Sequence, residues 1–471
     1  MLCMGEISPQ LADNETWVDQ TFEKCDDILH RQVYLGQGRQ EGLLVYVEVA
    51  VSNLMLEEHV IGLSDVQPLK SYEEGKAALL AGNGLLFLDG DTNCYKISSK
   101  GYPGLGVKKA ENEKVIRGSQ EAFTESEKIN VALIRKRLRD SRMKVEEQTV
   151  GVRSHTMTAL VYMEDLIYQG LLTTMKQQLQ RYEIDGILDS GMLEQLSEKH
   201  WLSPFPQFQT TERPDRAAAA VLEGRIVLVT DHSPQVLILP SDYNSFFQTS
   251  DDWYNQFQVA SYARILRFFA AILSMIFPAV YVAVATWHTS LLPTKLVLSM
   301  AEARQGVPFP ALGEILLMEI SFELLKEAGI RLPGPMGNTI GIVGGLIIGQ
   351  AAVDASLVSP IVVIVVAFTA LCSFAIPNEE FASAFRILKY GCIFMGAWLG
   401  LYGVALSGLW VLIHLSHLNS FGIPYLMPYV AADVNGYEDK KDSLFRFPLK
   451  YCVRRPIFAR RGERIKLRKR D

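Results

Sequence analysis

The sequence predicts a multi-domain protein with a soluble α/β N-terminal region, then an α-helical transmembrane region and a basic C-terminal tail. Three observations predict this order. Short apolar segments bounded by glycines, typical of strands, occur within the first 260 residues. Long apolar runs begin after Arg264, and basic residues dominate after Phe445. We expect two soluble α/β subdomains at 1–150 and 151–260, a polytopic membrane domain at 261–417 and a cytoplasmic tail at 418–471.

The soluble region is long enough for two small domains of mixed α/β type. Its sequence patterns predict a helix at 9–31 and a second helix, with a basic face, at 125–139. The predicted strands are 43–51, 84–88, 156–163, 225–230 and 235–239. A turn at 231–234 separates the last two strands.

Glycine recurs at every fourth position inside the apolar run 339–360 and just before it, at Gly337, Gly341, Gly345 and Gly349. In water each helix-interior glycine would cost roughly 1 kcal/mol relative to alanine. In a bilayer a stripe of small residues lets a second helix approach closely. We therefore expect a packed transmembrane helix here. A glycine-rich buried helix of a soluble protein is the alternative, which the surrounding apolar runs disfavour.

Four segments are apolar and long enough to be predicted as membrane crossings: 268–292, 340–357, 361–376 and 390–415. An even number of crossings would leave both ends of the chain on the same side. The N-terminus has no basic segment leading into an apolar core, so we expect it to stay cytoplasmic. After Phe445 the chain has eleven basic and two acidic residues, which the positive-inside rule also places in the cytoplasm, beside anionic lipid. Nucleic-acid binding is disfavoured, because this short tail has no recognisable fold of its own.

One predicted helix, 311–330, does not suit lipid. It has Glu319, Glu323 and Glu327 on one face with Lys326, and Glu314 on the opposite face. Each charge costs about 3 kcal/mol at the bilayer centre. We expect a re-entrant or interfacial helix, with 289–338 on the outer side. The alternatives are a helix that packs on the soluble side and one that lines water inside an oligomer.

The three glutamates and Asp354 are the candidate ion-pathway residues. Asp354 is the one charged residue in the predicted glycine-rich hairpin, and Gln350 precedes it by one helical turn. Carboxylates within a membrane usually pair or line water. A solvent-exposed position at the outer end of the helix is the alternative for Asp354.

No pattern indicates catalysis, a cofactor or a metal. The six cysteines form no CxxC pairs, and the histidines form no HExxH pattern. His414 and His417 are spaced as metal ligands can be, but histidines at the interfacial end of a span explain them better. Asp185 and Asp189 could be a catalytic pair, but acidic residues beside a turn more often cap a helix or face solvent.

Several sequence motifs resemble the A-subunit family of bacterial spore germinant receptors, the GerAA type. In the predicted membrane region these are the runs 308–333, 344–353 and 373–377, and in the rest of the chain they are 134–137, 211–215, 223–225 and 420–425. A further loop has Arg117, Gly118 and Glu121, but Ser119 and Ala122 stand where the family usually has Pro and Gly. Stage V sporulation protein AF is a relative with the same architecture.

The resemblance implies a membrane subunit that acts in nutrient-triggered spore germination. It also implies partners, namely a transporter-like B subunit and a C-subunit lipoprotein in the spore inner membrane. The subunit would form a homo-oligomer with a gated pathway for monovalent cations. The alternatives are a non-conducting membrane scaffold or signal relay, and an accessory protein of the AF type in the spore channel complex.

Overall fold

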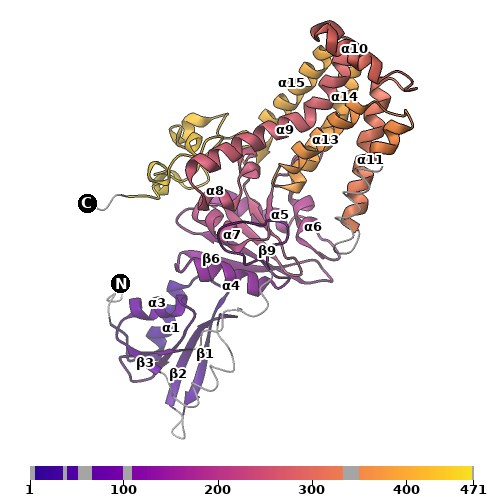
Figure 1. The fold of residues 1–471 in the computed structure, drawn as a ribbon. Helices are drawn as coiled ribbons and strands as arrows, with labels where there is room; N and C mark the ends of the chain where they lie inside the picture. Colours follow the sequence, from indigo (N-terminus) through magenta and orange to yellow (C-terminus); the bar gives the residue numbers. More distant parts are fainter. Residues whose placement is uncertain (1–5, 36–39, 51–65, 99–108, 332–348, 469–471) are drawn as a thin grey trace.

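Two soluble α/β units and a helical bundle follow one another along the molecule (Figure 1). The structure is a computed structural model and describes residues 6–35, 40–50, 66–98, 109–331 and 349–468. The bundle stands on the second soluble unit, and α10 (Thr294–Ala303) lies at the end of the bundle away from both soluble units (Figure 1).

The first unit is a five-stranded sheet with strand order β1-β2-β4-β5-β3, in which all neighbouring strands pair antiparallel. The strands are β1 (Ile28–Leu35), β2 (Gln40–Val47), β3 (Val66–Leu69), β4 (Gly84–Leu88) and β5 (Cys94–Ile97). Two helices, α1 (Leu11–Thr21) and α3 (Tyr72–Leu80), share a core with alternate residues of β2 such as Leu43 and Val45. The predicted helix 9–31 is therefore too long, because its second half is a turn and the start of β1.

The second unit is a three-layer structure around a sheet of order β6-β7-β9-β10-β8. The strands are β6 (Met143–Val150), β7 (Thr156–Met163), β8 (Gln209–Thr211), β9 (Ile226–Thr230) and β10 (Val236–Leu239). One face packs against α4 (Glu127–Arg137) and α7 (Pro214–Leu222). The opposite face packs against α5 (Gln169–Leu179) and α6 (Ser190–Ser197).

The predicted boundary at 150/151 falls inside the β6–β7 hairpin, whose strands pair from Met143 with Met163 to Val150 with Thr156. A domain boundary cannot separate two strands of one hairpin. The division between the two sheets therefore lies earlier, between β5 and α4. The predicted strand 156–163 and the helix predicted at 125–139 are found at β7 and α4.

The bundle is built around α9 (Phe257–Thr286), which packs along α13 and α14. Among the described residues, α9 alone is both long and apolar enough to cross a membrane, while α13 and α15 are shorter apolar helices. A Cβ at Gly396 of α14 would lie 2.8 Å from the carbonyl oxygen of Ala279, so α9 and α14 approach closely there. The other bundle elements are η2 (Thr289–Leu291), α11 (Ala311–Arg331), α13 (Pro360–Phe374), α14 (Glu379–Leu399) and α15 (Leu401–His417).

The predicted crossing 390–415 is two helices, not one. Gly400 has φ +62° between α14 and α15, and these two helices pack against each other as a hairpin. A left-handed glycine ends a helix but does not interrupt the apolar pattern, so hydropathy could not reveal it. Half of the predicted crossing 340–357, including Gly341 and Gly345, lies outside the described residues, and so does Gly337. Gly349 is described, and a Cβ there would lie 3.5 Å from Val363 of α13.

The helix α11 does not lie flat at one end of the bundle. Near its start, Glu314 accepts a hydrogen bond from the backbone of Ser359, which precedes α13. Near its end, Lys326 pairs with Glu379 at the start of α14, beside the second soluble unit. The helix thus runs along the bundle (Figure 1), and 289–338 cannot all lie on one side.

Residues 418–468 are folded against the rest of the protein and do not form a free tail. They contain β11 (Asn419–Ser420), β12 (Ile423–Pro424), η3 (Ala432–Asn435), η4 (Glu438–Lys441), η5 (Leu449–Tyr451) and η6 (Arg461–Glu463). Arg455 donates to the carbonyl of Leu222 at 2.9 Å, and the backbone of Arg460 donates to Leu166 at 2.8 Å. Several basic side chains thus bind carbonyl oxygens of the protein instead of facing lipid. The segment packs on the second soluble unit through these contacts.

Candidate charged site within the helical bundle

A buried ion-pair network joins α11 to α14. The Nζ of Lys389 lies 2.5 Å from Oε2 of Glu319 and 3.6 Å from Oε1 of Glu323. Glu319 is 1% exposed and Lys389 is 3% exposed. A buried charge is costly unless it is paired, so each residue of this pair stabilises the buried position of the other.

The network extends toward the soluble units through two more cations. The Nε of Arg386 lies 4.0 Å from Glu323, and its Nη2 lies 2.8 Å from Glu379. Lys326 lies 2.6 Å from Glu379. Three carboxylates therefore meet three cations, and the network is balanced in charge. Oε1 of Glu319 is buried without a hydrogen-bond donor among the described residues.

A second buried carboxylate holds the other end of α11. Glu314 is fully buried and accepts from Nε of Arg304 at 3.0 Å and from the backbone of Ser359 at 2.8 Å. Arg304 follows α10. The sequence correctly set Glu314 apart from the other glutamates but could not indicate these partners.

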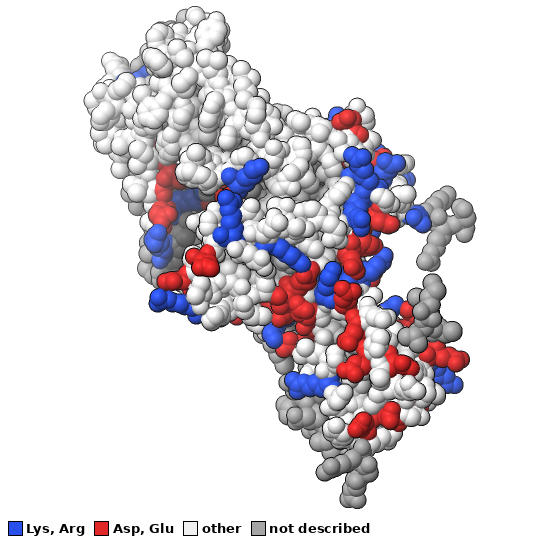
Figure 2. All heavy atoms as spheres, turned by 180° about the vertical axis from the view of Figure 1, so that it is seen from behind, with Lys and Arg blue, Asp and Glu red and all other residues white. Residues whose placement is uncertain are grey.

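The exposed side of α11 is apolar. Leu317, Ile320 and Leu324 are 41%, 50% and 65% exposed, whereas Glu314 and Glu319 are buried. A helix surrounded by water would have the reverse arrangement. On the face seen in Figure 2, the upper part of the bundle has almost no charged residues, whereas Lys, Arg, Asp and Glu are spread over the lower part of the bundle and the soluble units.

The four candidate ion-pathway residues do not form one cluster within the chain. Glu319 and Glu323 meet at Lys389. Glu327 pairs instead with Arg331 at 2.6 Å, with both side chains exposed. Asp354 is exposed and accepts from Gln350 at 2.9 Å, as its spacing of one turn predicts.

Arginines join the bundle to the second soluble unit. Arg264 of α9 is fully buried and binds Asp252 of α8 (Ser250–Tyr254) at 2.9 Å and Asp442 at 2.7 Å. Arg267 also binds Asp252, at 2.9 Å. Burial opposes ionisation of Asp252, but the two guanidinium groups hold its pKa below its ordinary value. These arginines therefore fix the base of α9 and do not face lipid headgroups.

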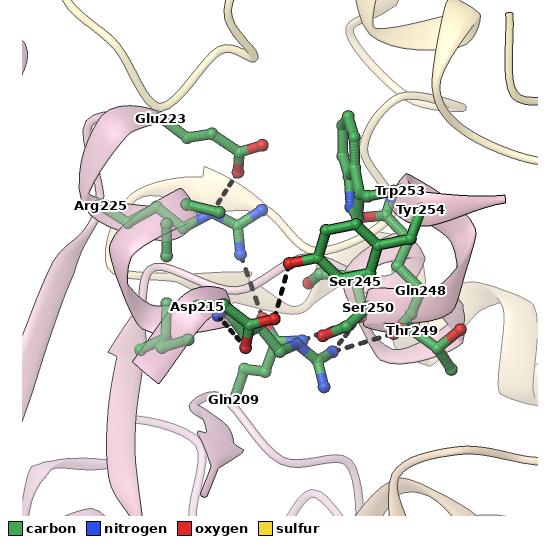
Figure 3. Close-up of a pocket in the computed structure, with 14 residues that line it drawn as sticks. Gln209, Asp215, Glu223, Arg225, Ser245, Gln248, Thr249, Ser250, Trp253 and Tyr254 are labelled. Carbon is green, nitrogen blue, oxygen red and sulfur yellow. Dashed lines mark hydrogen bonds and ion pairs between the residues drawn. The ribbon is translucent and has the colours of Figure 1, made fainter. Parts of the chain in front are cut away.

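A pocket of about 230 Å³ lies between α7 and α8 (Figure 3). Its polar groups bind one another: Asp215 accepts from the hydroxyl of Tyr254 at 2.7 Å, and Arg225 lies 3.4 Å from Glu223. Burial and the bond to Asp215 raise the pKa of Tyr254 to about 12. These contacts join α7 to α8, the short helix that leads into α9.

The motifs of the soluble units that resemble the family contact one another in the fold. Glu121 accepts from Lys136 at 2.8 Å and pairs with Arg137 at 2.5 Å. Ser119, one of the departures from the family pattern, accepts a hydrogen bond from Arg137 at 3.0 Å. Arg213 donates at 2.8 Å to the carbonyl of Ser119. These residues connect separate segments of the fold. In the described part of the chain, no group of three or more His, Cys, Asp or Glu side chains is arranged to hold a metal.

The fold is a helical bundle with internally paired charges, carried on a two-unit α/β module, and one of the described helices of the bundle is long and apolar enough to cross a membrane. The chain belongs to the Bacillus/Clostridium GerA spore germination protein family, whose model matches residues 53–458. The resemblance seen in the sequence is thereby confirmed.

Two curated relatives and one solved structure illustrate the similarity. The chain is 36% identical to the uncharacterized membrane protein YfkQ of Bacillus subtilis (strain 168), over 99% of this chain and 94% of the relative. It is 35% identical to spore germination protein KA of the same organism, over 98% and 88%. The crystal structure of the N-terminal domain of the A subunit of the Bacillus megaterium spore germinant receptor GerK3 matches with a TM-score of 0.41 and 24% identity, over 51% of this chain and 98% of that one.

Proposed function

We propose that this chain is the A-type membrane subunit of a spore germinant receptor and acts in nutrient-triggered germination. Its family and its relatives named as spore germination proteins support a role in germination. The expected location is the spore inner membrane, with both termini in the cytoplasm. The expected partners are a transporter-like B subunit and a C-subunit lipoprotein.

We further propose that the subunit forms a homo-oligomer with a gated pathway for monovalent cations. The observation that carries this proposal is the ion-pair network of α11, because glutamates kept inside a membrane bundle usually serve ions or protons. With Lys389 against Glu319, the carboxylates are neutralised and the pathway is closed. A shift of α11 relative to α14 would expose Glu319 and Glu323 to water, where carboxylates concentrate cations.

The test measures reversal potential and conductance of purified oligomers in vesicles across a K⁺ gradient. Glu319→Gln and Glu323→Gln should lower cation conductance and selectivity while oligomer size stays unchanged. Glu183→Gln, at an exposed position of the second soluble unit, is the matched control. Unchanged conductance and selectivity in assembled double variants would exclude these glutamates from the pathway.

The scaffold or relay function is the alternative, since these charges also hold α11 to α14. It predicts that neutralising Glu319 first disrupts assembly, because Lys389 would be left buried and unpaired. An accessory protein of the AF type would assemble without a B subunit. Co-purification with the B subunit from spore membranes therefore separates the receptor function from the accessory one.

A further inference from the structure

The C-terminal segment exposes an apolar ridge, which we define as Phe445, Phe447, Leu449, Tyr451 and Val453. These residues occupy every second position and are 53%, 45%, 58%, 53% and 38% exposed. Phe445 and Phe447 are exposed on either side of the buried Arg446, and Leu449 and Tyr451 are exposed on η5. The apolar residues are therefore on the open side.

The side facing the protein contains a buried charge. Arg446, between two exposed phenylalanines, is 6% exposed. Its guanidinium donates to the carbonyl oxygens of Asp252, Asn255 and Trp253, at the junction of α8 and α9, the last two at 3.1 and 3.3 Å. In water the opposite arrangement would be favoured, with arginine outside and phenylalanine inside. The arrangement therefore points to an apolar medium next to the ridge.

A groove of about 630 Å³ separates the ridge from the first turn of α9. Four aromatic residues line it, Phe257 from α9 and Phe445, Phe447 and Tyr451 from the ridge. The helix itself exposes Val259, Tyr262 and Leu266 just beyond the groove, at 56%, 71% and 55%. The C-terminal segment lies beside the lower part of α9 (Figure 1).

The length of α9 places this groove near a membrane surface. Thirty residues rise about 45 Å, whereas a bilayer hydrocarbon core is about 30 Å thick. The part of α9 nearest the soluble units therefore lies in the headgroup layer. Aromatic rings prefer that layer, and basic residues on its cytoplasmic side face anionic lipid. Lys441 lines the groove, and Lys450 is exposed beside the ridge.

We propose that this groove binds an anionic phospholipid, with an acyl chain between Phe257 and the ridge and the headgroup at Lys450. The proposal depends on membrane residence and not on ion conduction. A lipid bound here would contact both α9 and the C-terminal segment that Arg446 fixes to the α8–α9 junction. The lipid composition of the membrane would therefore affect the contacts at the base of the bundle.

The test uses the full chain reconstituted in vesicles that contain phosphatidylglycerol with a photoreactive acyl chain. After illumination, mass spectrometry should find lipid adducts on peptides that contain residues 445–453. The double variant Phe445→Ser, Phe447→Ser should lower this adduct yield by on the order of tenfold, since each phenylalanine contributes apolar contact area. Tyr34→Ser, at an exposed position in β1 of the first soluble unit, should leave the yield unchanged.

The headgroup is tested separately with Lys450→Glu, which changes an exposed residue and leaves the packing intact. It should reduce the preference for phosphatidylglycerol over phosphatidylcholine carrying the same photoreactive chain. Equal yields in the wild type and the phenylalanine variant would overturn the proposal. Crosslinks from the ridge to a second copy of the chain, without lipid adducts, would also overturn it and make the groove a subunit interface.

Discussion

At the scale of single residues, the soluble region has several carboxylates whose environments oppose their charge, and Glu127 is one of them. Glu127 at the start of α4 is 1% exposed, and neither carboxylate oxygen has a hydrogen-bond donor among the described residues. Burial, with Glu147 and Asp231 nearby, raises the pKa of Glu127 to about 8 from an ordinary 4.5. The residue lies between the two soluble units, since Glu48 of the first unit also acts on it.

The folded state therefore keeps a proton on Glu127 that the unfolded chain loses above pH 4.5. The contribution of this residue to the free energy of unfolding falls as the pH rises from 4.5 to 8, by at most about 5 kcal/mol. Glu127→Gln should raise the unfolding temperature at pH 8 and flatten its pH dependence. Thermal unfolding of the full chain in detergent at pH 6 and pH 8 checks this, with Glu183→Gln as control. A variant that kept the slope of the wild type would contradict the assignment.

Arg264 provides a second test at this scale. Arg264→Met would leave Asp442 without its guanidinium partner and Asp252 with Arg267 alone. Breaking a buried pair typically costs about 3–5 kcal/mol. The variant should lower the temperature at which half of the protein stays monodisperse in detergent. The exposed residue Arg153, with its partner Asp185 also exposed, is the matched control, and Arg153→Met should have little effect. The same transition temperature for both variants would show that the ion pairs of Arg264 do not stabilise α9.

At the scale of elements, the close contact of α9 with α14 depends on Gly396. A Cβ there would lie 2.8 Å from a backbone oxygen of α9, whereas a Cβ at Gly391 of the same helix would meet nothing within 4 Å. Gly396→Val should therefore destabilise the bundle by about 1–3 kcal/mol, and Gly391→Val should not. Unfolding of the two variants in detergent measures the difference. If both tolerate valine equally, the helices do not pack as closely as described.

The sequence was most informative where an element depends on its own residues. The predicted strand 156–163 and the predicted helix 125–139 match β7 and α4, because alternation and helical periodicity are local patterns. It was least informative about α11. The predicted cost of placing these charges in a membrane assumes that each charge is unpaired. Lys389, the partner of Glu319, lies seventy positions further along the sequence, so the pair cannot be seen in the sequence of α11. An arginine and a lysine within a largely apolar helix, Arg386 and Lys389, were the available signal for those partners.

The arginines of the C-terminal segment show the same limitation. Their number predicted contact with lipid headgroups, yet Arg446 and Arg455 bind backbone carbonyl oxygens. Composition gives the number of charges in a segment. It does not give their partners, which depend on how distant segments fold together.

At the scale of the whole molecule, both soluble units and the C-terminal segment lie at the same end of the bundle (Figure 1). If that end is cytoplasmic, a cysteine in place of Lys466 should be protected from a membrane-impermeant thiol reagent in intact cells and labelled after lysis. Ser290→Cys, in η2 at the opposite end, should be labelled before lysis. Labelling of the Lys466 variant in intact cells would contradict the proposed orientation.

If the pair between Lys389 and Glu319 keeps a cation pathway closed, the variant Lys389→Gln should open it, and this is measured as K⁺ flux from vesicles that contain assembled oligomers of the variant. Removing this cation should free the carboxylates of Glu319 and Glu323, so flux without nutrient should exceed that of wild-type oligomers of the same size. Adding Glu319→Gln and Glu323→Gln to the Lys389 variant should abolish the excess. K⁺ flux from assembled Lys389→Gln oligomers that is equal to the flux from wild-type oligomers would contradict the account.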